Sequence, residues 1–118
     1  MTINNKYDLE ERTLEFSKEI IRLCKSLPKN IITIPLIGQL IRSGTAIGAN
    51  YIEANDSLGK KDFLHRVKIA RKEAKETIYW LKLIIEAENK FEEQVNVLLK
   101  ENIELKNILS TIIKNSGS

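Results

Sequence analysis

The sequence predicts an all-α protein, an up-down-up-down antiparallel four-helix bundle. Three observations indicate it: apolar residues recur at helical spacing in four long segments, short connections join the segments, and only two prolines and five glycines interrupt 118 residues. Short connections force consecutive helices to run antiparallel, whereas a parallel sheet would need long crossovers. An apolar content of 42% in a chain of this length fits one domain with its own core, residues 1–118.

The first predicted helix covers about residues 8–27. Asp8 is its candidate N-cap, and Pro28 ends it. The apolar seam consists of Leu9, Thr13, Phe16, Ile20, either Leu23 or Cys24, and Leu27. Because Cys24 is the only cysteine and sits among aliphatic residues, we interpret it as a small buried hydrophobe in a reducing compartment rather than a reactive thiol.

The second predicted helix covers about residues 34–58. Thr33 is a candidate cap, Pro35 is tolerated in the first turn, and Gly59 is the candidate C-cap. The predicted seam consists of Ile37, either Leu40 or Ile41, Gly44, Ile47, Tyr51, Ala54 and Leu58. The centre of this helix therefore carries two glycines, Gly44 and Gly48.

Gly44 and Gly48 stand four residues apart, beside Ser43, in the stretch SGTAIGA. Each interior glycine costs a helix about 1 kcal/mol against alanine, so we favour the interpretation that another backbone approaches closely here. A phosphate-binding loop is the rival interpretation. It lacks the preceding strand and the glycine spacing that such loops require.

The third predicted helix covers about residues 60–88 and follows the second after a very short turn. In the resulting hairpin, two residues separated from Gly59 by the same number of positions, one on each helix, lie at the same height along the bundle axis. Arg42 is therefore expected to pair with Glu76, or with Glu73 one turn away. On the same reasoning Asn50 and Glu53 face the third helix, where we favour hydrogen bonds between helices or subunits over chemistry.

The fourth predicted helix covers about residues 92–114, and the tail 115–118 is expected to be frayed. Its seam consists of Val95, Leu98, Leu99, Asn102, Leu105, Leu109, Ile112 and Ile113. Asn102 is a polar residue within the seam, of the kind that fixes register. A single bundle would leave part of some apolar side chains in contact with water, which predicts self-association. These residues are Ile21, Trp80, Ile103 and Ile108.

The third helix carries a cationic face that we call the cationic stripe. Its members fall within one arc of the helix and are Lys61, His65, Lys68, Lys72, Lys75, Tyr79 and Lys82, flanked by Arg66 and Arg71. Eight basic and three acidic residues lie between positions 60 and 82, a larger surplus than the +3 of the whole chain. The stripe is either a nucleic-acid site, with lysines on phosphates and Tyr79 stacked on a base, or an ordinary solvated helix face.

The sequence offers no catalytic or cofactor site. His65 is the only histidine, so neither a metal site nor a nucleophile–histidine triad is supported, and we predict that the protein is not an enzyme. The polar N-terminus predicts no signal peptide, and no apolar run is long enough to span a membrane. We therefore expect a cytoplasmic protein that binds neither a cofactor nor a membrane.

Two stretches, LIRSGTAIGANYIEA and KKDFLHRVKIARKEAKETIYWLKLI, resemble the four-helix-bundle proteins of 23S rRNA intervening sequences, sometimes labelled S23 ribosomal protein. The resemblance is strict over about forty residues. The matching positions are Arg42, Ser43, Ile47, Gly48, Ala49, Asn50, Glu53, Ala54, Lys60, Lys61, Asp62, Phe63, Ala70, Glu73, Ala74, Glu76, Thr77, Tyr79, Trp80 and Leu81. We assign a structural or interface role to Arg42, Ser43, Gly44, Gly48, Asn50, Glu53, Glu73, Glu76 and Trp80.

The resemblance implies a homopentameric ring of bundles. It extends to the accessory variability determinant of diversity-generating retroelements, a pentameric barrel that binds nucleic acid and a reverse transcriptase through basic surface. On this basis the expected partners are further copies of the chain, RNA or DNA, and a reverse transcriptase or other protein. The alternative is a purely structural or protein-interaction module encoded in an rRNA intervening sequence.

Overall fold

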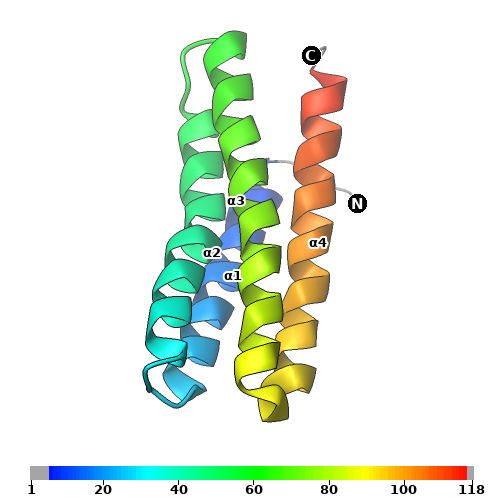
Figure 1. The fold of residues 1–118 in the computed structure, drawn as a ribbon. Helices are drawn as coiled ribbons and strands as arrows, with labels where there is room; N and C mark the ends of the chain where they lie inside the picture. Colours follow the sequence, from blue (N-terminus) through cyan, green and yellow to red (C-terminus); the bar gives the residue numbers. More distant parts are fainter. Residues whose placement is uncertain (1–5, 117–118) are drawn as a thin grey trace.

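The computed structural model describes residues 6–116, which contain helices and no strand. The elements are α1 (Lys6–Ser26), α2 (Thr33–Asn55), α3 (Lys60–Ala87), a short 3-10 helix η1 (Asn89–Phe91) and α4 (Glu92–Asn115) (Figure 1). The predicted all-α class is therefore confirmed for this part of the chain. Within the predicted frayed tail, α4 continues to Asn115, and residues 117–118 lie outside the described residues.

The four long helices form a bundle in which each helix contacts the next one in the sequence, and α1 also contacts α4. The α2–α3 turn lies at one end of the bundle, and the other two connections lie at the opposite end (Figure 1). Contacts between α2 and α3 run in opposite order along the two helices. Ser43 of α2 contacts Thr77 of α3. Asn50, which comes later in α2, contacts Arg66, which comes earlier in α3.

The interior is built from the predicted apolar seams. Its fully buried side chains come from all four helices and include Phe16, Ile20, Leu23, Leu40, Ile47, Val67, Leu81, Ile84, Val95, Leu105 and Leu109. Cys24 is only 4% exposed, and burial raises the pKa of its thiol to about 11, so the thiol stays protonated near neutral pH. Of the two alternatives for one seam position of α2, Leu40 is fully buried, whereas Ile41 is exposed at the edge of the helix.

Two predicted N-caps are wrong. Helix α1 begins at Lys6, which places Asp8 in the first turn rather than before it. At α2, the capping side chain belongs to Asn30, whose Oδ1 accepts the N–H groups of Ile32 at 2.9 Å and Thr33 at 3.0 Å. The Thr33 hydroxyl accepts the N–H of Asn30 at 3.0 Å in return, a reciprocal arrangement like a capping box.

The end of α2 also differs from the prediction. The helix ends at Asn55, and the N–H of Asp56 donates to the carbonyls of Ile52 and Glu53, both at 3.2 Å. Gly59 is consequently not a C-cap but the N-cap of α3, with an extended backbone. Leu58, predicted to extend the seam, lies in the turn and is fully exposed at 101%.

Candidate nucleic-acid interface

All seven side chains of the cationic stripe are exposed along α3. Residues three and four apart share one face of a helix, so the stripe follows the helix axis. Tyr79 is 59% exposed, and its ring meets the Trp80 ring edge-on with centroids 5.1 Å apart. This contact supports Tyr79 from one side while much of the ring stays accessible to a partner.

The two flanking arginines are half-buried at the borders of the stripe. Nη1 of Arg66 donates to Oδ1 of Asn50 at 3.4 Å, so Arg66 is directed toward α2. Asn50 also donates to the Ala46 carbonyl one turn earlier in α2 at 2.9 Å, and its contact with Arg66 links α2 to α3. Glu53 is exposed and forms no hydrogen bond or ion pair with any residue that the structure describes.

The predicted ion pair of the α2–α3 hairpin is present. Nη2 of Arg42 lies 2.6 Å from Oε2 of Glu76, and Nη1 lies 3.3 Å from Oε1 of Glu73. The same Glu76 oxygen accepts the indole N–H of Trp80 at 3.1 Å. The hydrogen bonds from Arg42 and Trp80 hold the pKa of Glu76 below its ordinary value.

We expect Arg42→Ala to remove a pH-dependent part of the stability. The pKa of Glu76 is lower in the folded protein than in the unfolded chain, where it is about 4.3. The ion pair therefore stabilises the fold fully above the unfolded pKa, and this stabilisation is lost as pH falls through the folded pKa. Arg42 is about half exposed, so the loss near neutral pH should stay within about 1 kcal/mol. Urea unfolding at a series of pH values tests this, and a constant difference down to about pH 2 would contradict it.

Close packing behind the hairpin accounts for the small residues of α2. A Cβ on Gly44 would lie 3.0 Å from the Ile20 side chain, and one on Gly48 would lie 2.9 Å from the Thr13 hydroxyl. The close neighbour is therefore α1: its backbone comes near at Gly48, where a Cβ would lie 3.5 Å from the Thr13 carbonyl carbon, whereas at Gly44 the near atoms belong to the Ile20 side chain. Ser43 is fully buried and lies 2.8 Å from the Thr77 hydroxyl, which joins α2 to α3.

One feature that the sequence did not reveal is the contact between the first and last helices. The guanidinium of Arg12 makes two hydrogen bonds to Glu101, at 2.6 and 2.9 Å, and one to Glu104 at 2.6 Å. These carboxylates raise the pKa of Arg12. No local pattern predicts this contact, because its partners lie about ninety residues apart.

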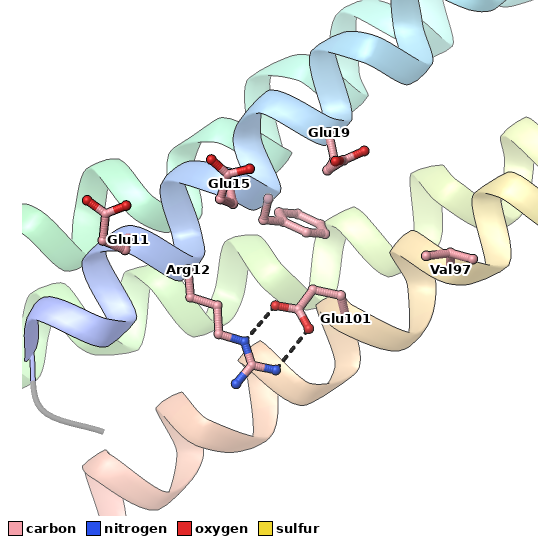
Figure 2. A pocket seen from close by; sticks show the side chains of 7 residues that line it. Glu11, Arg12, Glu15, Glu19, Val97 and Glu101 are labelled. Carbon is pink, nitrogen blue, oxygen red and sulfur yellow. Dashed lines mark hydrogen bonds and ion pairs between the residues drawn. The ribbon is translucent and has the colours of Figure 1, made fainter. Parts of the chain in front are cut away.

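Beside this contact lies an open cavity of about 500 Å³ between α1 and α4, which we call the α1–α4 groove (Figure 2). It is lined by Glu11, Arg12, Glu15, Phe16, Glu19, Val97 and Glu101. The groove combines an apolar floor with an acidic rim, on a chain whose net charge is positive.

Across residues 6–116, no three His, Cys, Asp or Glu side chains gather as a metal site would require. Within the same range, no helix has the long, weakly charged apolar stretch needed to cross a membrane. His65, the only histidine, is exposed on the stripe.

The fold and its surface define a small helical-bundle protein with two oppositely charged outer features, the cationic stripe and the α1–α4 groove. Residues 5–111 match the 23S rRNA-intervening sequence protein family, and the chain belongs to that family. A crystal structure of a protein of unknown function from the S23 ribosomal protein family of Bacteroides thetaiotaomicron VPI-5482 is similar to it. The two share 35% identity over 92% of this chain and 97% of the other, with a TM-score of 0.83.

The family and this neighbour agree with the resemblance to the 23S rRNA intervening-sequence proteins. Neither description names an enzymatic activity. No curated protein matches the chain.

Proposed function

We propose that this chain is a non-enzymatic, up-down-up-down bundle that assembles into a homopentameric ring and binds RNA or DNA through the cationic stripe. The observation that carries the proposal is the exposure of every stripe residue along one helix. From Lys61 to Lys82 the stripe is about 30 Å long, since a helix rises 1.5 Å per residue. That length lets one strand reach lysines near both ends of the stripe.

The composition of the stripe favours recognition of the backbone over recognition of bases. Lysines neutralise phosphates without regard to sequence, and the accessible Tyr79 ring offers one stacking surface that accepts any base. Binding through phosphates releases counterions and therefore weakens steeply as salt rises.

We expect fluorescence anisotropy to detect binding of single- or double-stranded RNA or DNA at about 50 mM salt, and an affinity about 100-fold lower at about 200 mM, as four phosphate contacts would give. Lys61→Glu/Lys82→Glu should weaken binding at least tenfold. Lys100→Glu/Lys114→Glu changes two exposed lysines of α4 by the same charge and should have a much smaller effect. No binding at low salt, or equal losses in both variants, would reject the proposal.

Exposed apolar side chains favour a second candidate function, a protein-interaction module with a reverse transcriptase or another protein as its partner. They lie on α1 and α2 and are Leu14, Ile21, Ile34, Ile41 and Ile52. Exposed apolar residues that lie together mark interaction sites, and Ile21 of α1 and Ile41 of α2 line one surface hollow. A protein that is still recovered with the chain after nuclease treatment, and that is lost with Ile41→Glu, would support this function.

A further inference from the structure

The α1–α4 groove has an incompletely covered apolar floor. Phe16 closes its base at 2% exposed, while Val97 on the α4 side is 67% exposed. Of the four pairs of neighbouring helices, α1 and α4 share the least contact, and the Arg12 ion pairs join them at one point. Figure 2 shows Glu15 and Glu19 beside the opening, away from the Arg12–Glu101 contact.

The acidic rim has little neutralising charge inside the molecule. Glu11, Glu15 and Glu19 follow one another at four-residue spacing, about 6 Å apart along the helix axis. Among the described residues, Glu15 pairs with Lys18 at 3.5 Å and Glu19 pairs with Arg22 at 2.9 Å, and such exposed pairs are weak. Arg12 is already bound by two carboxylates, Glu101 and Glu104. The rim is therefore suited to bind a row of positively charged side chains.

The cationic stripe supplies such a row at the same level of the bundle. Gly48 faces Thr13 and Gly44 faces Ile20, while on the other side of α2 Asn50 contacts Arg66 and Ser43 contacts Thr77. The part of α1 between residues 13 and 20 is thus level with the part of α3 between residues 66 and 77. That part of α3 carries Lys68, Lys72 and Lys75.

We propose that the α1–α4 groove of one copy receives the middle of the cationic stripe, Lys68, Lys72 and Lys75, of a second copy. The inference rests on the ring in the proposed function and names its contact surfaces. The two surfaces differ, so the contact is head-to-tail and generates a ring when the rotation closes. Rotation about an axis parallel to the helices keeps heights unchanged, so the glutamates and lysines of neighbouring copies meet without an axial shift.

In the assembled ring, the middle of the stripe would serve self-association and its ends would serve nucleic-acid binding. Its middle is covered by the neighbouring copy, whereas Lys61 and His65 at one end and Tyr79 and Lys82 at the other remain accessible. Nucleic acid bound to the assembled ring would then depend on the ends of the stripe. Substitutions in the middle and at the ends should therefore have separable effects.

The test is the mass of the full chain by analytical ultracentrifugation. Glu15→Lys/Glu19→Lys and Lys68→Glu/Lys72→Glu should each weaken self-association about 100-fold, because each places like charges across the contact. The quadruple variant combining all four changes restores opposite charges and should recover the wild-type mass. Glu86→Lys/Glu93→Lys reverses two exposed acids outside the groove and should leave the mass unchanged. Circular dichroism checks that each variant stays helical.

If both double variants keep the mass of the wild-type assembly, this contact is wrong, but the proposal of nucleic-acid binding is not affected. Loss of assembly in both without recovery in the quadruple variant would also overturn it, as would a wild-type chain that is monomeric at low salt. By contrast, an assembled wild type that binds no nucleic acid at low salt would reject the proposed function while the contact stands.

Discussion

Gly48→Leu is expected to destabilise the fold by about 3 kcal/mol, through overpacking between α2 and α1. A Cβ at this position would lie 2.9 Å from Oγ1 and 3.0 Å from Cβ of Thr13. Thr13 cannot move aside cheaply, because its hydroxyl hydrogen-bonds to the carbonyls of Leu9 at 2.9 Å and Glu10 at 3.0 Å. A leucine would therefore push the two helices apart along the line where they approach most closely.

Thermal unfolding measures this effect, and we expect the melting temperature to fall by about 10 °C. Gly38 provides the matched control within the same helix, because a Cβ there would meet nothing within 4 Å. Gly38→Ala should stabilise the protein by up to about 1 kcal/mol, whereas Gly48→Ala should destabilise it. An unchanged melting temperature for Gly48→Leu would show that α1 and α2 are not held at this distance.

Asn102→Asp is expected to destabilise the protein by about 3 kcal/mol at neutral pH, the second large effect. Asn102 is fully buried, and its Nδ2 donates to the Ala74 carbonyl at 2.8 Å. Its Oδ1 has no hydrogen-bond partner among the residues that the structure describes. The substitution replaces the Nδ2 donor, which is hydrogen-bonded, with a second carboxyl oxygen. When this carboxyl group ionises, it places an unpaired charge in the core.

The pH dependence distinguishes this mechanism from simple loss of packing. Burial raises the folded pKa of the introduced carboxyl above its unfolded value of about 3.9. The destabilisation should therefore be smallest near pH 3 and grow as pH rises from the unfolded toward the folded pKa. Urea unfolding across this range measures it, and a loss of stability independent of pH would contradict the assignment.

Asn102→Leu is the companion variant and should leave stability unchanged or raise it by about 1 kcal/mol. It removes the unpaired oxygen at similar volume, and the Ala74 carbonyl lies within α3, where helical bonding continues. A more stable variant that fails to assemble would assign Asn102 a role in specifying the bundle, as polar residues in helix seams can have.

The fold was largely predictable because its helices are long, amphipathic and closely spaced in the sequence. Seam positions such as Leu81 and Leu109 follow helical periodicity, and their burial confirms it. The errors fall at helix ends. Capping by Asn30 rather than Thr33, and the end of α2 before Leu58, depend on a few local hydrogen bonds that periodicity does not encode.

The candidate sites were only partly predictable. The Arg42–Glu76 pair follows from counting outward from a short turn, since both residues belong to one hairpin. The α1–α4 groove depends instead on how far apart the first and last helices settle. That separation is set by packing of the whole bundle, so no sequence pattern placed Glu15, Glu19 and Val97 around one opening.

The unequal contacts among the helices have a consequence for the order in which the chain folds. The α2–α3 hairpin has the most extensive contacts, and its partners are close in sequence, so little loop-closure entropy is lost in forming it. Contact between α1 and α4 requires the two ends of the chain to meet and contributes least. The transition state for folding should therefore contain the central hairpin, with high φ-values there and low ones where α1 meets α4.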